Sequence, residues 1–287
     1  MMNIHNDKIR IFNFNIKERY APLATSLPSH TSVFKKWPQD GDHERAPLPN
    51  YLSIATMTSQ GSDITDSSYI LMGLPVHVVE NDRLLMRIEN NLQSTGLSIH
   101  FHGFEMKNAL EYDGVVGLNQ CAIPPEEKFD YNFKVEETEG LYWYHTHSGN
   151  LGIDSHNMIK GPLIVHPDTV ESRKLVDELN AFVAKDQVGS IVDYGPLISY
   201  GNERILFFSD GFFKSDTLLE MTYLSGLNPP VQLNDDGFVA ANMEHEFGTL
   251  NGKLREVIHV VRGEFTSFVF SMVDHILHTV FPLMVSL

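Results

Sequence analysis

The sequence has little cysteine, little basic charge and no hydrophobic N-terminal segment. Its one cysteine, Cys121, excludes an internal disulfide framework and a metal site built from several thiolates. The 21 Lys and Arg residues are outnumbered by 37 Asp and Glu residues, and this acidic balance speaks against nucleic acid as a partner, because phosphates require basic patches. Residues 1–10 are polar and charged, so no secretory signal is expected in this chain, and its compartment is left open.

Membrane insertion is not expected either. The apolar stretch over 268–287 has about the length of a membrane span. It contains Asp274, His275 and His278, however, and such groups are costly at mid-bilayer. The final apolar run, 278–287, has no turn or polar residue to close it. We expect this run to lie on an incomplete sheet whose open edge promotes self-association.

Short apolar runs bounded by Gly, Pro, Asn and Asp dominate the chain and predict an all-β sandwich or barrel. The segment 20–67 is rich in Pro, Ser, Thr and Asp, and it is predicted to be a long loop. Apolar residues recur with helical spacing over 169–187, which predicts a helix that connects two domains. The predicted strands are 10–16, 75–79, 83–89, 98–102, 129–135, 141–147, 162–166, 204–208, 257–261, 266–272 and 278–287.

Two His-x-His pairs carry the chemistry. Side chains at i and i+2 of a strand share a face, so His100 and His102 point the same way, about 7 Å apart along the strand, as do His145 and His147. One such pair is common on a half-exposed strand and in most cases binds no metal. Two pairs, both flanked by aromatic residues and both on predicted strands, indicate a metal site, and imidazole suits copper, zinc, iron and nickel.

The segments 100–103 (His-Phe-His-Gly) and 142–147 (Tyr-Trp-Tyr-His-Thr-His) resemble the first and second copper motifs of multicopper oxidases such as laccases and ascorbate oxidases. The resemblance is strong over about 71–167 and continues weakly through short segments as far as residue 275. It implies tandem cupredoxin-like (plastocyanin-like) Greek-key β-sandwich domains, the second incomplete, in the N-terminal part of such an oxidase. The expected division is a first domain over 1–167 with a long N-terminal loop region, a helical linker over 168–200, and a partial second domain over 201–287.

The resemblance also implies copper as the cofactor and a role for each histidine. His100 would bind the type 2 copper. His102 and His145 would share one type 3 copper, and His147 would bind the other. An acidic residue near the first motif helps to move protons towards oxygen in the family, which makes Asp113 a candidate catalytic residue and Glu111 a weaker one. A simple turn at Asp113-Gly114 is the competing explanation.

The sequence also departs from the family's pattern. The His-x-x-His-x-His and His-Cys-His motifs of the family's third domain do not occur. Cys121 has Gln120 and Ala122 beside it, so it lacks the flanking histidines of a type 1 copper site, and we expect a free, partly buried thiol. His156 and His166 are expected to be surface or edge residues. The remaining histidines considered, which show no partner spacing, are His77, His245, His259, His275 and His278.

These observations leave two main functional hypotheses. A complete family member would oxidise phenolic, ascorbate-like or metal-ion reductants and reduce O₂ to water, and this chain alone, without a type 1 site and with half of the cluster ligands, would be inactive. The alternative is a non-catalytic copper-binding module. A two-domain nitrite reductase or small two-domain laccase fits the length, but both need type 1 ligands within the chain. Members of the multicopper oxidase family, which the sequence resembles, are often secreted.

Overall fold

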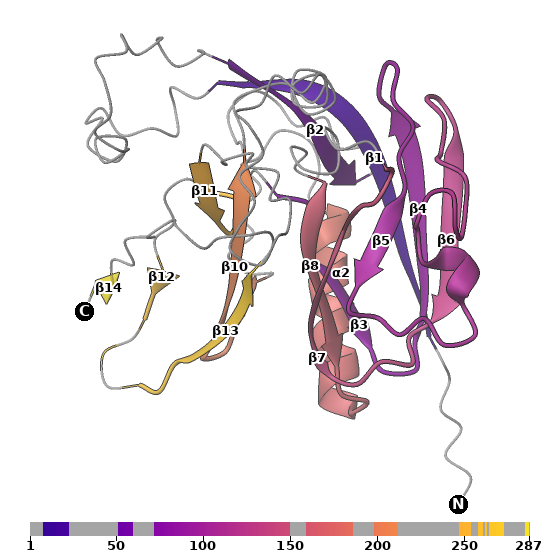
Figure 1. The fold of residues 1–287 in the computed structure, drawn as a ribbon. Coiled ribbons are helices and arrows are strands. Elements are labelled where there is room, and N and C mark those ends of the chain that lie inside the picture. The colour runs from indigo at the N-terminus through magenta and orange to yellow at the C-terminus, as the bar shows by residue number, and fades with distance from the viewer. Residues whose placement is uncertain are drawn as a thin grey trace, which may run out of the picture.

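The described part of the chain is dominated by β-strands in two units (Figure 1). The structure is a computed structural model. The first unit is a sandwich of two four-stranded sheets, and the second is built around a smaller sheet. The structure describes residues 8–22, 51–59, 72–149, 159–185, 198–211, 247–253, 258–260, 262, 264–272 and 285–286.

One sheet of the sandwich has the strand order β2-β1-β4-β6. The long strand β1 runs parallel to β4 from the Ile9–Arg83 pair onward and antiparallel to β2 from the Phe14–Ser59 pair onward. Along β1, Phe12, Phe14 and Ile16 are buried and alternate with more exposed neighbours, which is the pattern of a strand with one covered face. The strands of this sheet are β1 (Ile9–Pro22), β2 (Tyr51–Ser59), β4 (Arg83–Asn91) and β6 (Lys128–Lys134).

The other sheet has the order β3-β8-β7-β5. β8 is buried along its whole length, because one of its faces covers the sandwich core and the other lies on the side of the helix and the second unit (Figure 1). The core between the sheets is made largely of aromatic and branched side chains such as Phe101, Tyr131 and Tyr144. The strands of this sheet are β3 (Val76–Val79), β5 (Ile99–His102), β7 (Gly140–Thr146) and β8 (Lys160–His166).

The helix α2 (Val170–Lys185) packs against β3 and is fixed to the sandwich by charged groups. The carboxylate of Asp82, fully buried after β3, accepts hydrogen bonds from Arg10 Nε at 2.6 Å and from Arg173 Nη1 at 2.8 Å. Arg10 also contacts Asp177 on the helix, and Arg173 Nε donates to Asp168 at 2.7 Å. Strand β1, the β3–β4 turn and α2 therefore meet in one ion-pair network.

The second unit lies beside β7 and β8, and β13 contacts β7 (Figure 1). Strand β10 pairs with β9 and β11 on one edge and with β13, in parallel, on the other. Ile205 and Phe207 of β10 join the same hydrophobic core as the sandwich. The strands of this unit are β9 (Ser199–Tyr200), β10 (Glu203–Gly211), β11 (Phe247–Leu250), β12 (Ile258–His259), β13 (Ser267–Met272) and β14 (Val285–Ser286).

The all-β class, the helix and the predicted strands that lie within the described residues are confirmed, with ends shifted by a few residues. The predicted loop over 20–67 is wrong in part, because β2 occupies 51–59 and pairs with β1. Most of that loop, and most of the final run over 278–287, lie outside the described residues. The domain boundaries at 167 and 200 stay predictions. Within the described part of the chain, no helix is long and apolar enough to cross a membrane.

Two expectations about single residues are also wrong. His166 is not a surface residue: it is 5% exposed on β8, and its Nε2 lies 3.0 Å from Nδ1 of the fully buried His77 on β3. The imidazoles stack, with Tyr200 of the second unit beside both. Neutral imidazoles satisfy each other in this way, since one ring nitrogen donates and the other accepts. Cys121 is exposed rather than partly buried.

Candidate metal centre

The register between β5 and β7 gathers the histidines on one face of the sheet. His100 lies directly opposite His145, and His102 lies directly opposite Trp143. The alternate residues Phe101 and Tyr144 face the core and are fully buried. Because successive side chains of a strand point to opposite faces, the same alternation that builds the core turns the imidazoles outward.

Three imidazoles converge closely enough to share metal ions. One ring nitrogen from each of His100, His102 and His145 lies within 4.8 Å of the other two. The shortest recorded approach, between His102 Nδ1 and His145 Nε2, is 3.4 Å. His147 completes the group, with its ring centroid 5.4 Å from that of His100 and 6.1 Å from that of His145. The four side chains named from the sequence are therefore neighbours.

These distances suit metal coordination by imidazole. Metal–nitrogen bonds of about 2.0 Å place two ligands of one tetrahedral ion about 3.3 Å apart, close to the 3.4 Å between His102 and His145. The wider 4.8 Å span of the three-histidine group exceeds the reach of one ion unless the side chains rotate, and it is compatible with ligands spread over neighbouring ions. Nitrogen donors of this type suit copper, among other transition metals.

Backbone carbonyls orient two of the rings. Nδ1 of His100 lies 2.6 Å from the carbonyl oxygen of Asp113, and Nδ1 of His145 lies 2.7 Å from that of Thr146. An Nδ1–H that donates to a carbonyl leaves Nε2 unprotonated for a metal, which is the usual arrangement of metal-binding histidines. One carboxylate oxygen of Asp113 also lies 3.2 Å from the same His100 nitrogen.

The loop after Asp113 is built against these strands. Gly114 has a φ of +82°, and a Cβ atom there would lie 1.9 Å from the carbonyl oxygen of Ile99. Two residues later, the Val116 N–H donates to the carbonyl oxygen of His147 at 3.3 Å. The loop therefore supports both His100 and His147. The turn that competed with a catalytic role for Asp113 is present, and it holds the residue at His100.

Burial keeps two of the imidazoles neutral. Desolvation and, to a lesser extent, the nearby histidines lower the pKa of His145 to about 4, although its hydrogen bond to Thr146 acts in the opposite direction. The pKa of His102 is also lowered, first by desolvation and then by the charges of His100 and His147. A metal binds the deprotonated ring. The structure therefore supplies these ligands in their binding form at neutral pH.

The sequence analysis missed Trp143 as a residue of the site. Its indole stacks on His102, with ring centroids 4.5 Å apart, and on His145, with centroids 4.2 Å apart. The signal was present, because Trp143 stands two residues before His145 and so shares its face. Glu111, the weaker acidic candidate, is an exposed residue of the short 3-10 helix Leu110–Tyr112.

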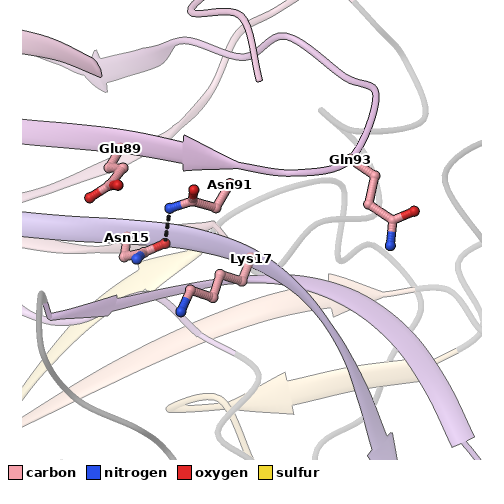
Figure 2. Close-up of a pocket in the computed structure, with 5 residues that line it drawn as sticks. All are labelled: Asn15, Lys17, Glu89, Asn91 and Gln93. Atoms are coloured by element: carbon pink, nitrogen blue, oxygen red, sulfur yellow. Dashed lines mark hydrogen bonds between the residues drawn. The ribbon is translucent and has the colours of Figure 1, made fainter. Parts of the chain in front are cut away.

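A separate open pocket of about 470 Å³ lies on the other sheet, at β1 and β4 (Figure 2). Its lining is polar, and the Asn91 side-chain amide donates to Asn15 Oδ1 at 2.8 Å across the two strands. None of the four site histidines lines it. The histidine cluster, rather than this pocket, is the candidate functional site.

Known proteins resemble the part of the chain that contains the four histidines. The family model described as "Multicopper oxidase" matches residues 60–170, a range that contains all four histidines. The chain is 36% identical over 107 residues to the iron transport multicopper oxidase fetC of Epichloe festucae, covering 36% of this chain and 17% of that protein. It is 42% identical over 159 residues to laccase-1 of Cryptococcus neoformans var. neoformans, covering 53% of this chain and 24% of that protein.

The fold is also that of a solved family member. The crystal structure of Fet3p, described as a multicopper oxidase that functions in iron import, superposes on 86% of this chain and 33% of its own, with a TM-score of 0.51 at 21% identity. The chain thus spans about a third or less of the length of these three relatives. Residues 60–170 of the chain therefore match the multicopper oxidase family.

Proposed function

We propose that this chain binds copper through His100, His102, His145 and His147 and supplies one half of the ligand set of an oxygen-reducing copper cluster. The observation that carries the proposal is the convergence of three imidazole nitrogens within 4.8 Å on one face of a sheet. Packing polar rings so closely without a ligand is costly. Following the family, His102 and His145 share one copper, His100 binds a second and His147 a third.

In this proposal the 287 residues supply the four histidines and not the remaining ligands of the cluster. The chain has no His-Cys-His motif, and its one cysteine is exposed and not flanked by histidines. His102 is likewise exposed, so one side of the cluster is open to further ligands. Electron entry and oxygen reduction therefore need another part of the protein or a partner chain. Bound copper would supply one-electron redox chemistry towards a phenolic, ascorbate-like or metal-ion reductant and O₂.

Asp113 has two tasks in this proposal. Its carbonyl and its carboxylate both lie at Nδ1 of His100, at 2.6 and 3.2 Å, and so hold that ring with Nε2 towards the cluster. Its carboxylate is one-fifth exposed, which allows it to exchange protons with solvent. We therefore assign Asp113 the proton-transfer role that the family gives to an acidic residue at this place.

The test is copper binding by the chain itself. Only two tryptophans are present, so a Trp37→Phe variant leaves Trp143, which contacts two of the proposed ligands, as the sole fluorescent indole. Copper(II) added to this variant should quench its fluorescence and stay bound through gel filtration, as metal analysis would measure. Replacing His145 by Ala should abolish both effects. The matched control, His166→Gln, removes a described histidine whose ring contacts His77 and Tyr200, and it should change neither.

The outcome also separates the two functional hypotheses. Copper bound by the chain without oxygen consumption, with oxidation restored by a second polypeptide that carries the missing motifs, supports the half-site. Copper bound stoichiometrically and not released to a chelator would favour the self-sufficient binding module. Absence of copper binding that depends on His145 would refute both.

A further inference from the structure

An indole packs against both of the histidines proposed to share one copper. Trp143 is nearly parallel to each ring, at 23° to His102 and 26° to His145. The two imidazoles themselves are tilted by 44° and lie further apart, with centroids 5.5 Å from one another. We infer that Trp143 is a positioning residue that fixes the ring planes of His102 and His145 and thereby strengthens copper binding. This inference rests on the proposed function.

His102 is the ligand that needs such support. The rings of His100 and His145 are each held at Nδ1 by a backbone carbonyl. His102 has no carbonyl partner of this kind among the described residues; its recorded hydrogen-bonding contact is the 3.4 Å approach to His145. A metal bound between these two nitrogens would replace that contact. The χ2 torsion of histidine is broad, so an exposed ring without a partner would sample many orientations. The face of Trp143 restricts that torsion instead.

The position of Trp143 in the sheet makes the contact rigid. It lies opposite His102 on β5 and opposite Pro162 on β8, in the middle of three paired strands. The indole is half-buried and packs against the hydrophobic core. Because the strands fix the backbone on both sides, the ring planes of His102 and His145 are set before a metal arrives, and less conformational freedom is lost on binding.

The stack also favours the metal-bound state electronically. The face of an indole carries partial negative charge and attracts positively charged groups, more strongly than other aromatic rings do. An imidazole that donates electrons to a metal ion becomes electron-poor, so its contact with the indole improves on binding. A side chain that served the core alone would contribute equally to the metal-free and metal-bound protein. The two roles therefore differ in their effect on metal affinity.

The experiment compares three variants on the full chain. In Trp143→Leu, copper affinity measured by chelator competition should fall about 10-fold to 100-fold, the range for residues that orient metal ligands. In Trp143→Phe, which keeps a smaller stacking face, the loss should be about three-fold. The control Tyr142→Leu removes the neighbouring half-buried aromatic residue, which contacts Phe104 and none of the four histidines. It should leave copper affinity and the copper EPR spectrum unchanged.

A second measurement needs no copper. The ring current of Trp143 should shift the imidazole proton resonances of metal-free His102 and His145 upfield, and Trp143→Leu should remove the shifts. Wild-type affinity in a folded Trp143→Leu variant overturns the inference. If that variant does not fold, absence of the ring-current shifts in the wild-type chain overturns it. Failure of the wild-type chain to bind copper while the shifts are present would instead refute the proposed function and leave the ring contact standing.

Discussion

Gly114 offers a stringent test of how the fold supports the site. Its φ of +82° is a conformation that costs an alanine about 1–2 kcal/mol. A methyl group there would also lie 1.9 Å from the carbonyl oxygen of Ile99 and 2.9 Å from the nitrogen of His100. These are backbone atoms of β5, which cannot move without breaking strand pairs. Relieving the clash should add about 1–3 kcal/mol, so Gly114→Ala should lower the free energy of unfolding by about 2–5 kcal/mol.

The same loop provides a matched control. Gly117 has a φ of +83°, but a Cβ atom there would meet nothing within 4 Å. Gly117→Ala therefore carries the conformational cost alone, about 1–2 kcal/mol. Urea unfolding followed by circular dichroism measures both variants. The Gly114→Ala variant should in addition lose about 10-fold in copper affinity, because displacement of Asp113 releases the ring of His100. Equal destabilisation by the two substitutions, or unchanged affinity in Gly114→Ala, would refute the reasoning.

Two further predictions concern buried charge. Burial, reinforced by the charge of Arg10, lowers the pKa of His166 to about 4, below the value of about 6.5 in an unfolded chain. The unfolded state then binds more protons between these values, so the stability that His166 contributes should be fully present above about pH 6.5 and fall by up to about 3 kcal/mol towards pH 4. The free energy of unfolding, measured with urea, should rise with pH across this range, and His166→Gln should reduce this pH dependence. An unchanged pH dependence in the variant would argue against the lowered pKa of His166. Replacing the buried Asp82 by Asn should cost about 3–5 kcal/mol, because Arg10 and Arg173 each lose one of their two carboxylate partners, the one that is fully buried. Replacing Asp130 by Asn at an exposed ion pair should cost less than about 1 kcal/mol. Similar losses in the two variants would contradict the role of the buried network.

The sequence predicted what depends on short-range alternation. The spacing of His100 and His102, and of His145 and His147, defines which face each side chain occupies, and this rule needs no knowledge of the rest of the chain. Their convergence also required that β5 and β7 be neighbours, which the resemblance to multicopper oxidases implied and the structure contains. The same rule places Trp143 on the face of His145, which follows it by two residues in the strand.

Long-range pairing accounts for the rest. Strand β2 lies in a segment rich in loop-forming residues, and its paired residues on β1 are 29 to 45 positions earlier in the chain, from Pro22–Tyr51 to Phe14–Ser59. His77 and His166 are 89 residues apart and meet only because β3 and β8 are adjacent. The carbonyl of Asp113 is a backbone group, to which no side-chain motif points. None of these contacts leaves a local pattern in the sequence.

The pairing of β5 with β7 has a consequence for how the site arises. Phe101 and Tyr144 are paired in the core by the same register that pairs His100 with His145. A shift by one residue would turn every side chain of a strand to the other face, so a chain that buried these aromatics correctly has already placed the imidazoles. The four proposed ligands are therefore brought together by folding rather than by a metal. A chain that has never been exposed to copper should therefore fold to the same sandwich, with the four imidazoles already in place.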